Sequence, residues 1–200
     1  MKILLTCFEP FGGNATNVSS EVASTFSPDS IDGSEIVVAQ LPVSFKRVSE
    51  NLIRLIDLHC PNIILMLGQA GNRKKISIER IAINLMDSKM GDNEGLCPNE
   101  QAIIASTENA LFSNMPLKKI AENWHAAEID ADISNSAGLY VCNCAFYNAI
   151  YLAHQKELDC KIGFIHLPKI SNCEQKTLML EHMHKAIKIA LATTILSFKF

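Results

Sequence analysis

The sequence has no apolar run that approaches the roughly 18 residues needed to span a membrane. Its apolar start over 1–5 is too short for a signal peptide. The 18 lysine and arginine residues are scattered rather than gathered in a stripe, and the formal net charge is −3. These absences argue against membrane and nucleic-acid partners and favour a cytoplasmic protein.

The cysteine spacing excludes two further classes of protein. The seven cysteines are an odd number and include no C-x-x-C pair; they stand at positions 7, 60, 97, 142, 144, 160 and 173. Neither a disulfide framework nor a structural zinc site is therefore expected. No internal repeat, low-complexity segment or linker interrupts the chain, so we expect a single domain over 1–200.

The order of the predicted elements is typical of an α/β protein. We predict strands over 1–5, 36–41, 62–67, 75–84, 103–106, 127–131 and 161–168. Helices are predicted from Ser19 with Ser19 or Ser20 as N-cap, over 44–59, 117–126, from Cys142 and over 175–198. In the last helix, we predict one stripe of residues at helical spacing: Leu178, Met179, His182, Ala186, Ile189, Ala190 and Thr193. A strand–helix–strand unit ending in a glycine-rich loop predicts a site beyond the carboxyl ends of the strands.

Cys142 is the candidate nucleophile. A turn of small residues over 136–138 precedes it, and apolar residues follow it at helical spacing. A cysteine in the first turn of a helix lies among unpaired N–H groups at the positive end of the dipole, which favours the thiolate. A buried core cysteine is the alternative interpretation, and Cys144 is a rival thiol in the same helix.

A thiol nucleophile needs an imidazole base and a third group that orients the ring. His166 ends a buried-looking predicted strand, at the sheet edge where Cys142 is also expected; a core histidine is the alternative. Glu79 is the best-placed acid. It either orients the imidazole or only pairs with a nearby arginine, Arg73 or Arg80. The residues themselves thus suggest a Cys142–His166–Glu79 constellation.

Five motifs stand in order along the chain: Thr6-x-Phe-Glu-Pro-Phe-Gly-Gly13, Gly68-Gln-Ala-Gly-x-Arg73, Ile78-Glu-Arg-Ile-Ala-Ile-Asn84, Ser136-Ala-Gly-x-Tyr-Val-Cys-Asn143 and Gly163-Phe-Ile-His-x-Pro168. Together they resemble the pyroglutamyl peptidase I family, which are cysteine peptidases that remove an N-terminal pyroglutamate. Any one motif alone would be weak. Five in register over nearly the whole chain are specific.

The resemblance implies a three-layer α/β/α sandwich with a mostly parallel central sheet, similar in shape to purine nucleoside phosphorylases. It implies that Cys142 is the nucleophile, His166 the general base and acid, and Glu79 the residue that orients the imidazole. It also implies a homo-oligomer, a dimer or tetramer, that needs no metal or cofactor.

The resemblance further assigns a pocket for N-terminally pyroglutamylated peptides. Phe8 and Phe11 would flank the flat lactam ring, Gln69 would lie near the site, and Val43 and Val141 would close the pocket. Pyroglutamate has no free amine, so apolar walls with a few backbone hydrogen bonds suffice to hold it.

Four residues depart from the family pattern. Cys7 and Asn72 stand where the family usually has glycine, and Cys97 replaces a customary glutamine. Lys89 replaces an arginine implied to act near the oxyanion. Lysine keeps the charge and loses the planar fork of donors. We therefore expect activity that survives at a lowered level.

Two other functions stay open at this point. A divergent homologue could bind pyroglutamyl or other peptide termini without efficient turnover. Thiol alkylation at Cys142 would inactivate a peptidase but would change nothing in a catalytic assay of such a homologue. A phosphorylase-like enzyme would fit the glycine loop and the fold. It would need anion sites for phosphate, and the sequence offers few beyond Arg73 and Arg80.

Overall fold

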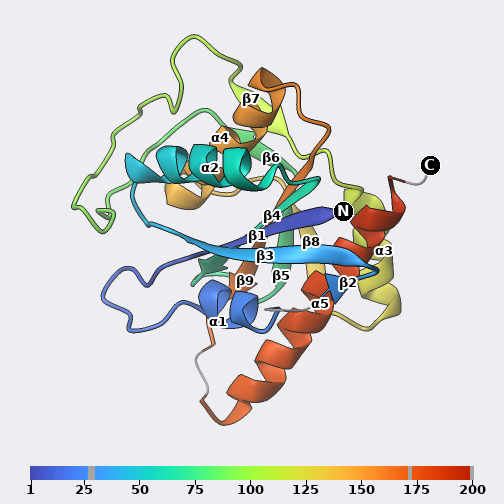
Figure 1. Cartoon of the computed structure of the whole chain (residues 1–200). Helices are drawn as coiled ribbons and strands as arrows, with labels where there is room; N and C mark the ends of the chain where they lie inside the picture. The colour runs from blue at the N-terminus through green and yellow to red at the C-terminus, as the bar shows by residue number, and fades with distance from the viewer. Residues whose placement is uncertain (27–29, 171–172, 199–200) are drawn as a thin grey trace.

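The computed structural model describes residues 1–26, 30–170 and 173–198. Within these ranges a seven-stranded sheet runs in the order β2-β3-β1-β4-β9-β5-β8 (Figure 1). The strands are β1 (Lys2–Phe8), β2 (Ser30–Ile31), β3 (Ser34–Leu41), β4 (Ile63–Ala70), β5 (Ile76–Glu79), β8 (Ala131–Ser134) and β9 (Lys161–Pro168). A separate antiparallel pair joins β6 (Ile81–Ile83) to β7 (Ala110–Phe112).

The sheet is parallel through its middle and reverses toward one edge. Strands β3, β1, β4 and β9 are parallel to one another. Strand β5 is antiparallel to β9, and β8 is parallel to β5. At the other edge β2 is antiparallel to β3. The mostly parallel sheet predicted from the resemblance is confirmed.

Helices cover both faces of the sheet. They are α1 (Val18–Ser24), α2 (Arg47–His59), α3 (Leu117–Ala126), α4 (Val141–Gln155) and α5 (Lys176–Leu196), with a short 3₁₀ turn η1 (Cys173–Gln175) before α5. Helices α2 and α4 pack on one face, and α1, α3 and α5 pack on the other (Figure 1). This arrangement confirms the three-layer α/β/α fold.

Strand β4 shows why the core has two halves. It is buried along almost its whole length, as expected of a central strand covered on both faces. Ile63, Leu65 and Leu67 point to the layer of α1, α3 and α5, while Ile64 and Met66 point to α2 and α4. Because successive side chains of a strand point to opposite faces, β4 contributes to two separate apolar clusters.

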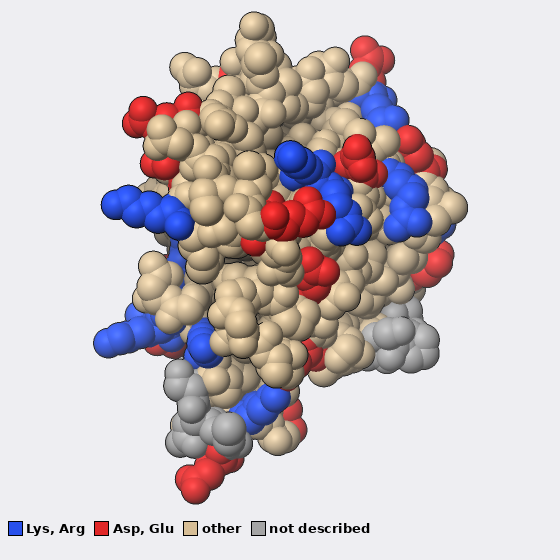
Figure 2. All heavy atoms as spheres, turned by 90° about the vertical axis from the view of Figure 1, so that its left-hand side faces the viewer, with Lys and Arg blue, Asp and Glu red and all other residues tan. Residues whose placement is uncertain are grey.

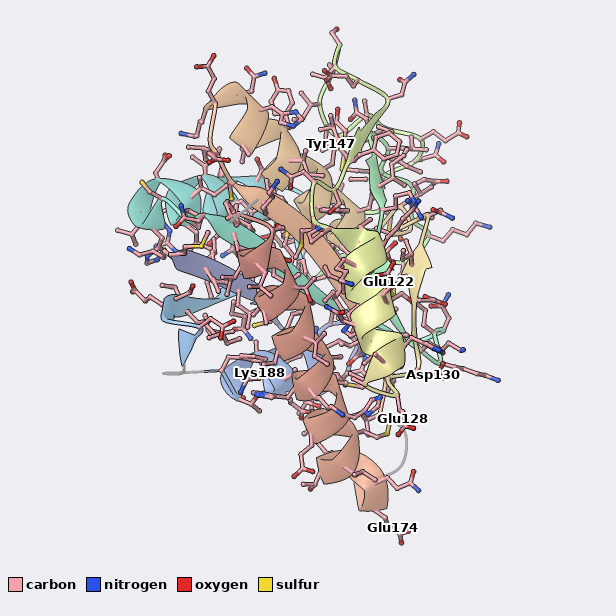
Figure 3. The ribbon with its side chains drawn as sticks, turned by 90° about the vertical axis from the view of Figure 1, so that its right-hand side faces the viewer. Glu122, Glu128, Asp130, Tyr147, Glu174 and Lys188 are labelled. Atoms are coloured by element: carbon pink, nitrogen blue, oxygen red, sulfur yellow. The ribbon has the colours of Figure 1, made fainter. Side chains whose placement is uncertain are left out.

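Helices α3 and α5 lie side by side on one face (Figure 3). Trp124 of α3 is fully buried, and its indole N–H donates to the backbone oxygen of Ala186 at 2.7 Å. The predicted stripe on α5 is partly wrong, because Leu178 is 67% exposed while Met183, Ile187 and Leu191 are buried. No helix in the described ranges is both long and apolar enough to cross a bilayer.

The strand predicted over 75–84 is two strands in different sheets. The chain leaves the main sheet at Arg80, whose N–H donates to Ser134 O while its own carbonyl accepts from Ser113 N. The strand predicted over 103–106 is wrong: this stretch forms turns, held by the side chain of Asn84. The strand predicted over 127–131 lies later, in β8.

Two helix starts also differ from prediction. Helix α1 begins after Asn17, whose side-chain oxygen accepts from Ser19 N at 3.0 Å, so Asn17 is the N-cap. Helix α2 begins at Arg47, although the Ser44 hydroxyl accepts from Arg47 N at 3.2 Å. The bounds of α3 and β9 are as predicted.

Candidate active site

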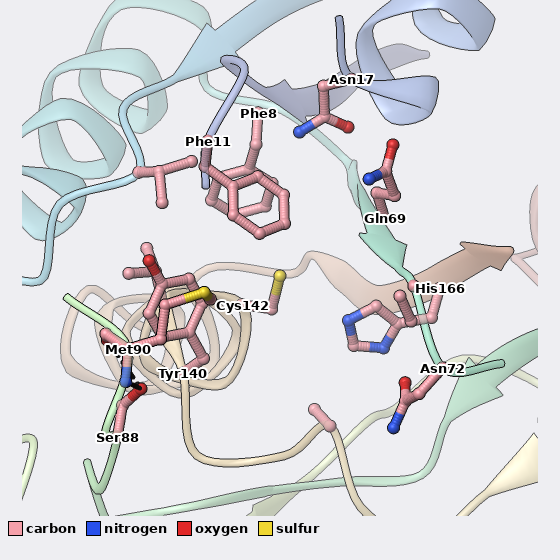
Figure 4. A pocket seen from close by; sticks show the side chains of 15 residues that line it. Phe8, Phe11, Asn17, Gln69, Asn72, Ser88, Met90, Tyr140, Cys142 and His166 are labelled. Atoms are coloured by element: carbon pink, nitrogen blue, oxygen red, sulfur yellow. Dashed lines mark hydrogen bonds between the residues drawn. The ribbon is translucent and has the colours of Figure 1, made fainter. Parts of the chain in front are cut away.

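A pocket of about 340 Å³ opens beyond the carboxyl ends of β1, β4 and β9 (Figure 4). Its wall is made by Phe8, Phe11, Asn17, Val43, Gln69, Ala70, Gly71, Asn72, Ser88, Met90, Ala137, Tyr140, Val141, Cys142 and His166. Crevices at this edge of an open α/β sheet are where such folds bind ligands. On the side of the molecule shown in Figure 2, charges of both signs are interspersed among uncharged residues.

Cys142 is the second residue of α4, in the first turn as predicted, and its half-buried side chain lines the pocket. The N-cap, Tyr140, has an extended backbone and gives no side-chain hydrogen bond to the helix start. The first N–H groups of α4 therefore have no side-chain cap and remain available as donors.

Gly68 of β4 lies directly beside the Cys142 thiol. A Cβ atom added at Gly68 would stand 3.0 Å from Cys142 Sγ and 2.7 Å from Phe164 Cζ. Phe164 is fully buried, so its ring has little room to move. A side chain at position 68 would thus occupy the space that the Cys142 thiol and the Phe164 ring now fill.

His166 and Glu79 meet because β5 reverses beside β9. The antiparallel register pairs Ser77 with His166, so Glu79, two residues further on, projects from the same face of the sheet. His166 Nδ1 lies 2.7 Å from Glu79 Oε1, and the two side chains are 5% and 0% exposed. With Nδ1 engaged, Nε2 is the ring nitrogen left for the pocket.

Arg73 is the arginine that pairs with Glu79. Its Nη2 lies 2.8 Å from Glu79 Oε1, whereas Arg80 donates to Asn135 Oδ1. Glu79 Oε1 thus receives both the imidazole and the guanidinium, while Oε2 is buried without a hydrogen-bond partner among the described residues. Glu79 therefore makes both of the contacts that the sequence left as alternatives: it pairs with an arginine and it contacts the imidazole.

The electrostatics favour a neutral thiol beside a neutral imidazole. Burial raises the pKa of Cys142 to about 12; Glu79 adds to this, and Arg73 opposes it. Burial lowers the pKa of His166 below its ordinary value of 6.5, against the hydrogen bond and charge of Glu79. Burial of the thiol therefore opposes the stabilisation of a resting thiolate that the helix start was expected to give.

The five predicted substrate residues all line the pocket: Phe8, Phe11, Val43, Gln69 and Val141. Gln69 has one end fixed, since its Oε1 accepts from Val18 N at 3.0 Å. Its Nε2 group is the end left to face the cavity (Figure 4).

Lys89 does not lie in the pocket wall. It is exposed, while its neighbours Ser88 and Met90 line the cavity. Their loop is held by Asp92, which accepts from Phe45 N at 2.9 Å. The predicted long loop over 85–98 gave the only sequence signal for these wall residues.

Tyr140 is a further wall residue; it lies in one of the five motifs but was given no role there. Its hydroxyl donates to Gly91 O at 2.9 Å, and its ring lies 6.0 Å from that of Phe11. Its position directly before the helix start of Cys142 was a usable signal.

The other cysteines lie away from the pocket wall or outside the described side chains. Cys144 is buried, with Asn148 Nδ2 at 3.5 Å, and Cys7 is buried in the opposite core half. Cys97 is exposed, and the side chain of Cys173 lies outside the described part. Within the described ranges no group of three or more His, Cys, Asp or Glu residues could hold a metal ion.

Comparison with known proteins gives a consistent family match. A family profile described as "Pyroglutamyl peptidase" matches residues 1–196. A pyrrolidone-carboxylate peptidase of Thermococcus onnurineus is 41% identical over 199 residues, covering 98% of this chain and 99% of that protein. One from Thermosipho africanus is 48% identical over 168 residues, covering 84% and 82%.

Solved structures agree with the sequence relatives. A pyrrolidone carboxyl peptidase of Pyrococcus furiosus superposes with a TM-score of 0.93 at 33% identity, covering 98% of this chain and 99% of that one. The pyrrolidone carboxyl peptidase from Thermococcus litoralis gives 0.92 at 30% identity, covering 99% and 94%.

Proposed function

The chain belongs to the pyroglutamyl peptidase family, and we propose that it removes an N-terminal pyroglutamyl residue from peptides as a cysteine peptidase. The observation that carries this proposal is the 2.7 Å contact between His166 and a fully buried Glu79, at a pocket that also exposes Cys142. An imidazole oriented in this way beside a thiol is the arrangement of a nucleophile–base–acid triad.

In the acylation step, His166 Nε2 takes the thiol proton as Cys142 Sγ attacks the carbonyl carbon of the pyroglutamyl residue. The carbon–nitrogen bond then breaks, and the imidazolium gives its proton to the leaving amine. A pyroglutamyl thioester and a shortened peptide result. Glu79 accepts the Nδ1–H throughout and stabilises the transient imidazolium.

In the deacylation step, His166 takes a proton from water, which attacks the thioester and releases pyroglutamic acid. The proton returns to Cys142 Sγ. Both steps pass through a tetrahedral oxyanion. Because Lys89 lies outside the pocket wall, the uncapped N–H groups at the start of α4 are the proposed donors to that oxyanion.

The pocket walls suit an uncharged ring. Phe8 and Phe11 lie on one side of Cys142, and Met90 and Tyr140 lie on another (Figure 4). Gln69 offers an amide donor above the apolar surfaces, which can fix a lactam carbonyl. A protonated amine in the same place would lose hydration without a carboxylate in the wall to pair with it.

We expect kcat/KM to remain high as the pH falls below 6.5. The proposed base must be neutral, and burial lowers the pKa of His166, so the neutral form persists at lower pH than for a free imidazole. A pH profile on a pyroglutamyl amide measures this: the acid limb should have its midpoint below 6.5. A midpoint above that value would contradict a neutral resting imidazole.

The function is tested with two amides that share one fluorescent leaving amine, a pyroglutamyl amide and a prolyl amide, under reducing conditions. We expect turnover of the first and none of the second, because prolyl carries a charged amine in place of the lactam. Equal turnover would remove the lactam preference. If the folded protein turned over neither amide, the result would favour a homologue that binds peptide termini without turnover.

The remaining predictions from the resemblance belong to the same proposal. We propose that residues 1–200 act as one peptidase domain, that the protein works without a cofactor, and that it forms a cytoplasmic homo-oligomer.

A further inference from the structure

We propose that Arg73 is a positioning residue for the reaction: it ties the carboxylate that holds His166 to the turn that carries Cys142. This inference rests on the proposed function. Arg73 follows β4, and its Nη2 lies 2.8 Å from Glu79 Oε1 and 2.8 Å from Ser136 O. One guanidinium nitrogen therefore contacts the base's partner and the segment before the nucleophile.

The first contact fixes the orienting carboxylate. Glu79 is fully buried, and its Oε1 is shared between His166 Nδ1 at 2.7 Å and Arg73 Nη2 at 2.8 Å. The Oε2 atom has no hydrogen-bond partner among the described residues. Removing one member of a buried ion pair leaves an uncompensated charge, so the carboxylate, and with it the ring of His166, depends on the arginine.

The second contact fixes the approach to the nucleophile. Ser136 O also accepts from Ser134 Oγ at 3.1 Å, and Ser136 Oγ accepts from Gly138 N at 3.2 Å. Gly138 has a φ of +78°, which lets the chain turn sharply here. Three residues later α4 begins, so the position of this turn sets where Cys142 enters the pocket.

The charge of Arg73 acts on the same two groups. Two charged groups set the field at His166: Glu79 from β5 and Arg73 from the loop after β4. The Cys142 thiol, at the start of α4, lines the same pocket. After burial and the opposing Glu79, Arg73 lowers the pKa of His166. Loss of this cation should therefore raise the His166 pKa and move the acid limb of kcat/KM to higher pH.

The test compares Arg73→Gln with Arg80→Gln. Both variants remove one positive charge, but Arg80 contacts Asn135 rather than Glu79. We expect Arg73→Gln to lower kcat roughly 10–100-fold, by analogy with the loss of an outer partner of a metal-bound imidazole, with little change in KM and an acid limb at higher pH. Arg80→Gln should keep the wild-type limb. The conservative Arg73→Lys should restore the limb and part of kcat.

A double-mutant cycle of Arg73→Gln with Glu79→Gln tests whether Arg73 affects kcat by positioning Glu79 or only by stabilising the fold. If Arg73 acts through Glu79, Arg73→Gln should cost little more once Glu79→Gln is present. The double variant removes the buried carboxylate together with its cation, so it remains testable even where Arg73→Gln alone does not fold.

Several outcomes would overturn the proposal. They are a wild-type acid limb in Arg73→Gln, an equal shift in Arg80→Gln, a loss confined to KM, or additive costs in the cycle. Each of these requires an active wild type. An inactive wild type would instead refute the proposed function.

Discussion

Cys142→Ser is expected to abolish turnover of a pyroglutamyl amide while leaving the fold intact. A serine hydroxyl is a far weaker nucleophile than a thiol, and the proposed base is the neutral imidazole of His166. Losing the nucleophile of a triad costs roughly 10⁴-fold or more in kcat. The measurement is kcat/KM under reducing conditions, with thermal unfolding to show that the variant is folded.

Cys144→Ser is the matched control, since it makes the same change two residues further along α4. Cys144 is buried behind the pocket wall beside Asn148, so we expect kcat/KM within a few-fold of wild type and a stability loss of about 1 kcal/mol. Activity that survived Cys142→Ser and vanished in Cys144→Ser would move the nucleophile to the rival thiol.

Gly68→Ala is expected to lower kcat/KM by about 10²-fold, because a displacement near 1 Å at the reacting atoms has that effect. The new Cβ would stand 2.7 Å from Phe164 Cζ and 3.0 Å from Cys142 Sγ. The ring of Phe164 is held between Phe8 and Phe146 and lies 4.7 Å from the His166 ring. Any adjustment therefore moves the thiol, the imidazole or both.

The same variant should lose about 1–3 kcal/mol of unfolding free energy through overpacking. Gly163→Ala is the control for that loss. Its Cβ would collide with Met115 on the opposite face of the sheet, so we expect reduced stability with unchanged kcat/KM. Urea unfolding and steady-state kinetics measure the two quantities. Equal kinetic losses in both variants would mean that Gly68 has no particular relation to the nucleophile.

The sequence predicted the fold wherever one periodic pattern filled a whole element. Helix α3 and strand β9 have the predicted bounds. The errors lie where a local pattern is overridden by distant partners. The isoleucines over 76–83 look like one strand. At Arg80, however, the chain stops pairing with β8 and enters a second sheet. No local signal marks that change of partner.

The site was predictable to the extent that its residues lie in motifs. Cys142, His166 and the five predicted substrate residues all line one pocket, and Glu79 contacts His166 from behind. The resting charge state was not predictable, because it depends on desolvation, and helix position alone suggested the opposite. The sequence also could not show which arginine pairs with Glu79, since Arg73 and Arg80 are both near it in sequence. Only the structure shows that the partner is Arg73.

The place of β9 in the sheet has a consequence for how the protein is made. Of the described strands, this one is the last to emerge during synthesis, yet it lies between β4 and β5. Until β9 inserts, β4 and β5 each have an unpaired edge in what becomes the middle of the sheet. Unpaired strand edges can pair with other strands and cause misfolding or aggregation. His166 lies on that same strand, so the proposed catalytic site is completed only when the strand closes the sheet.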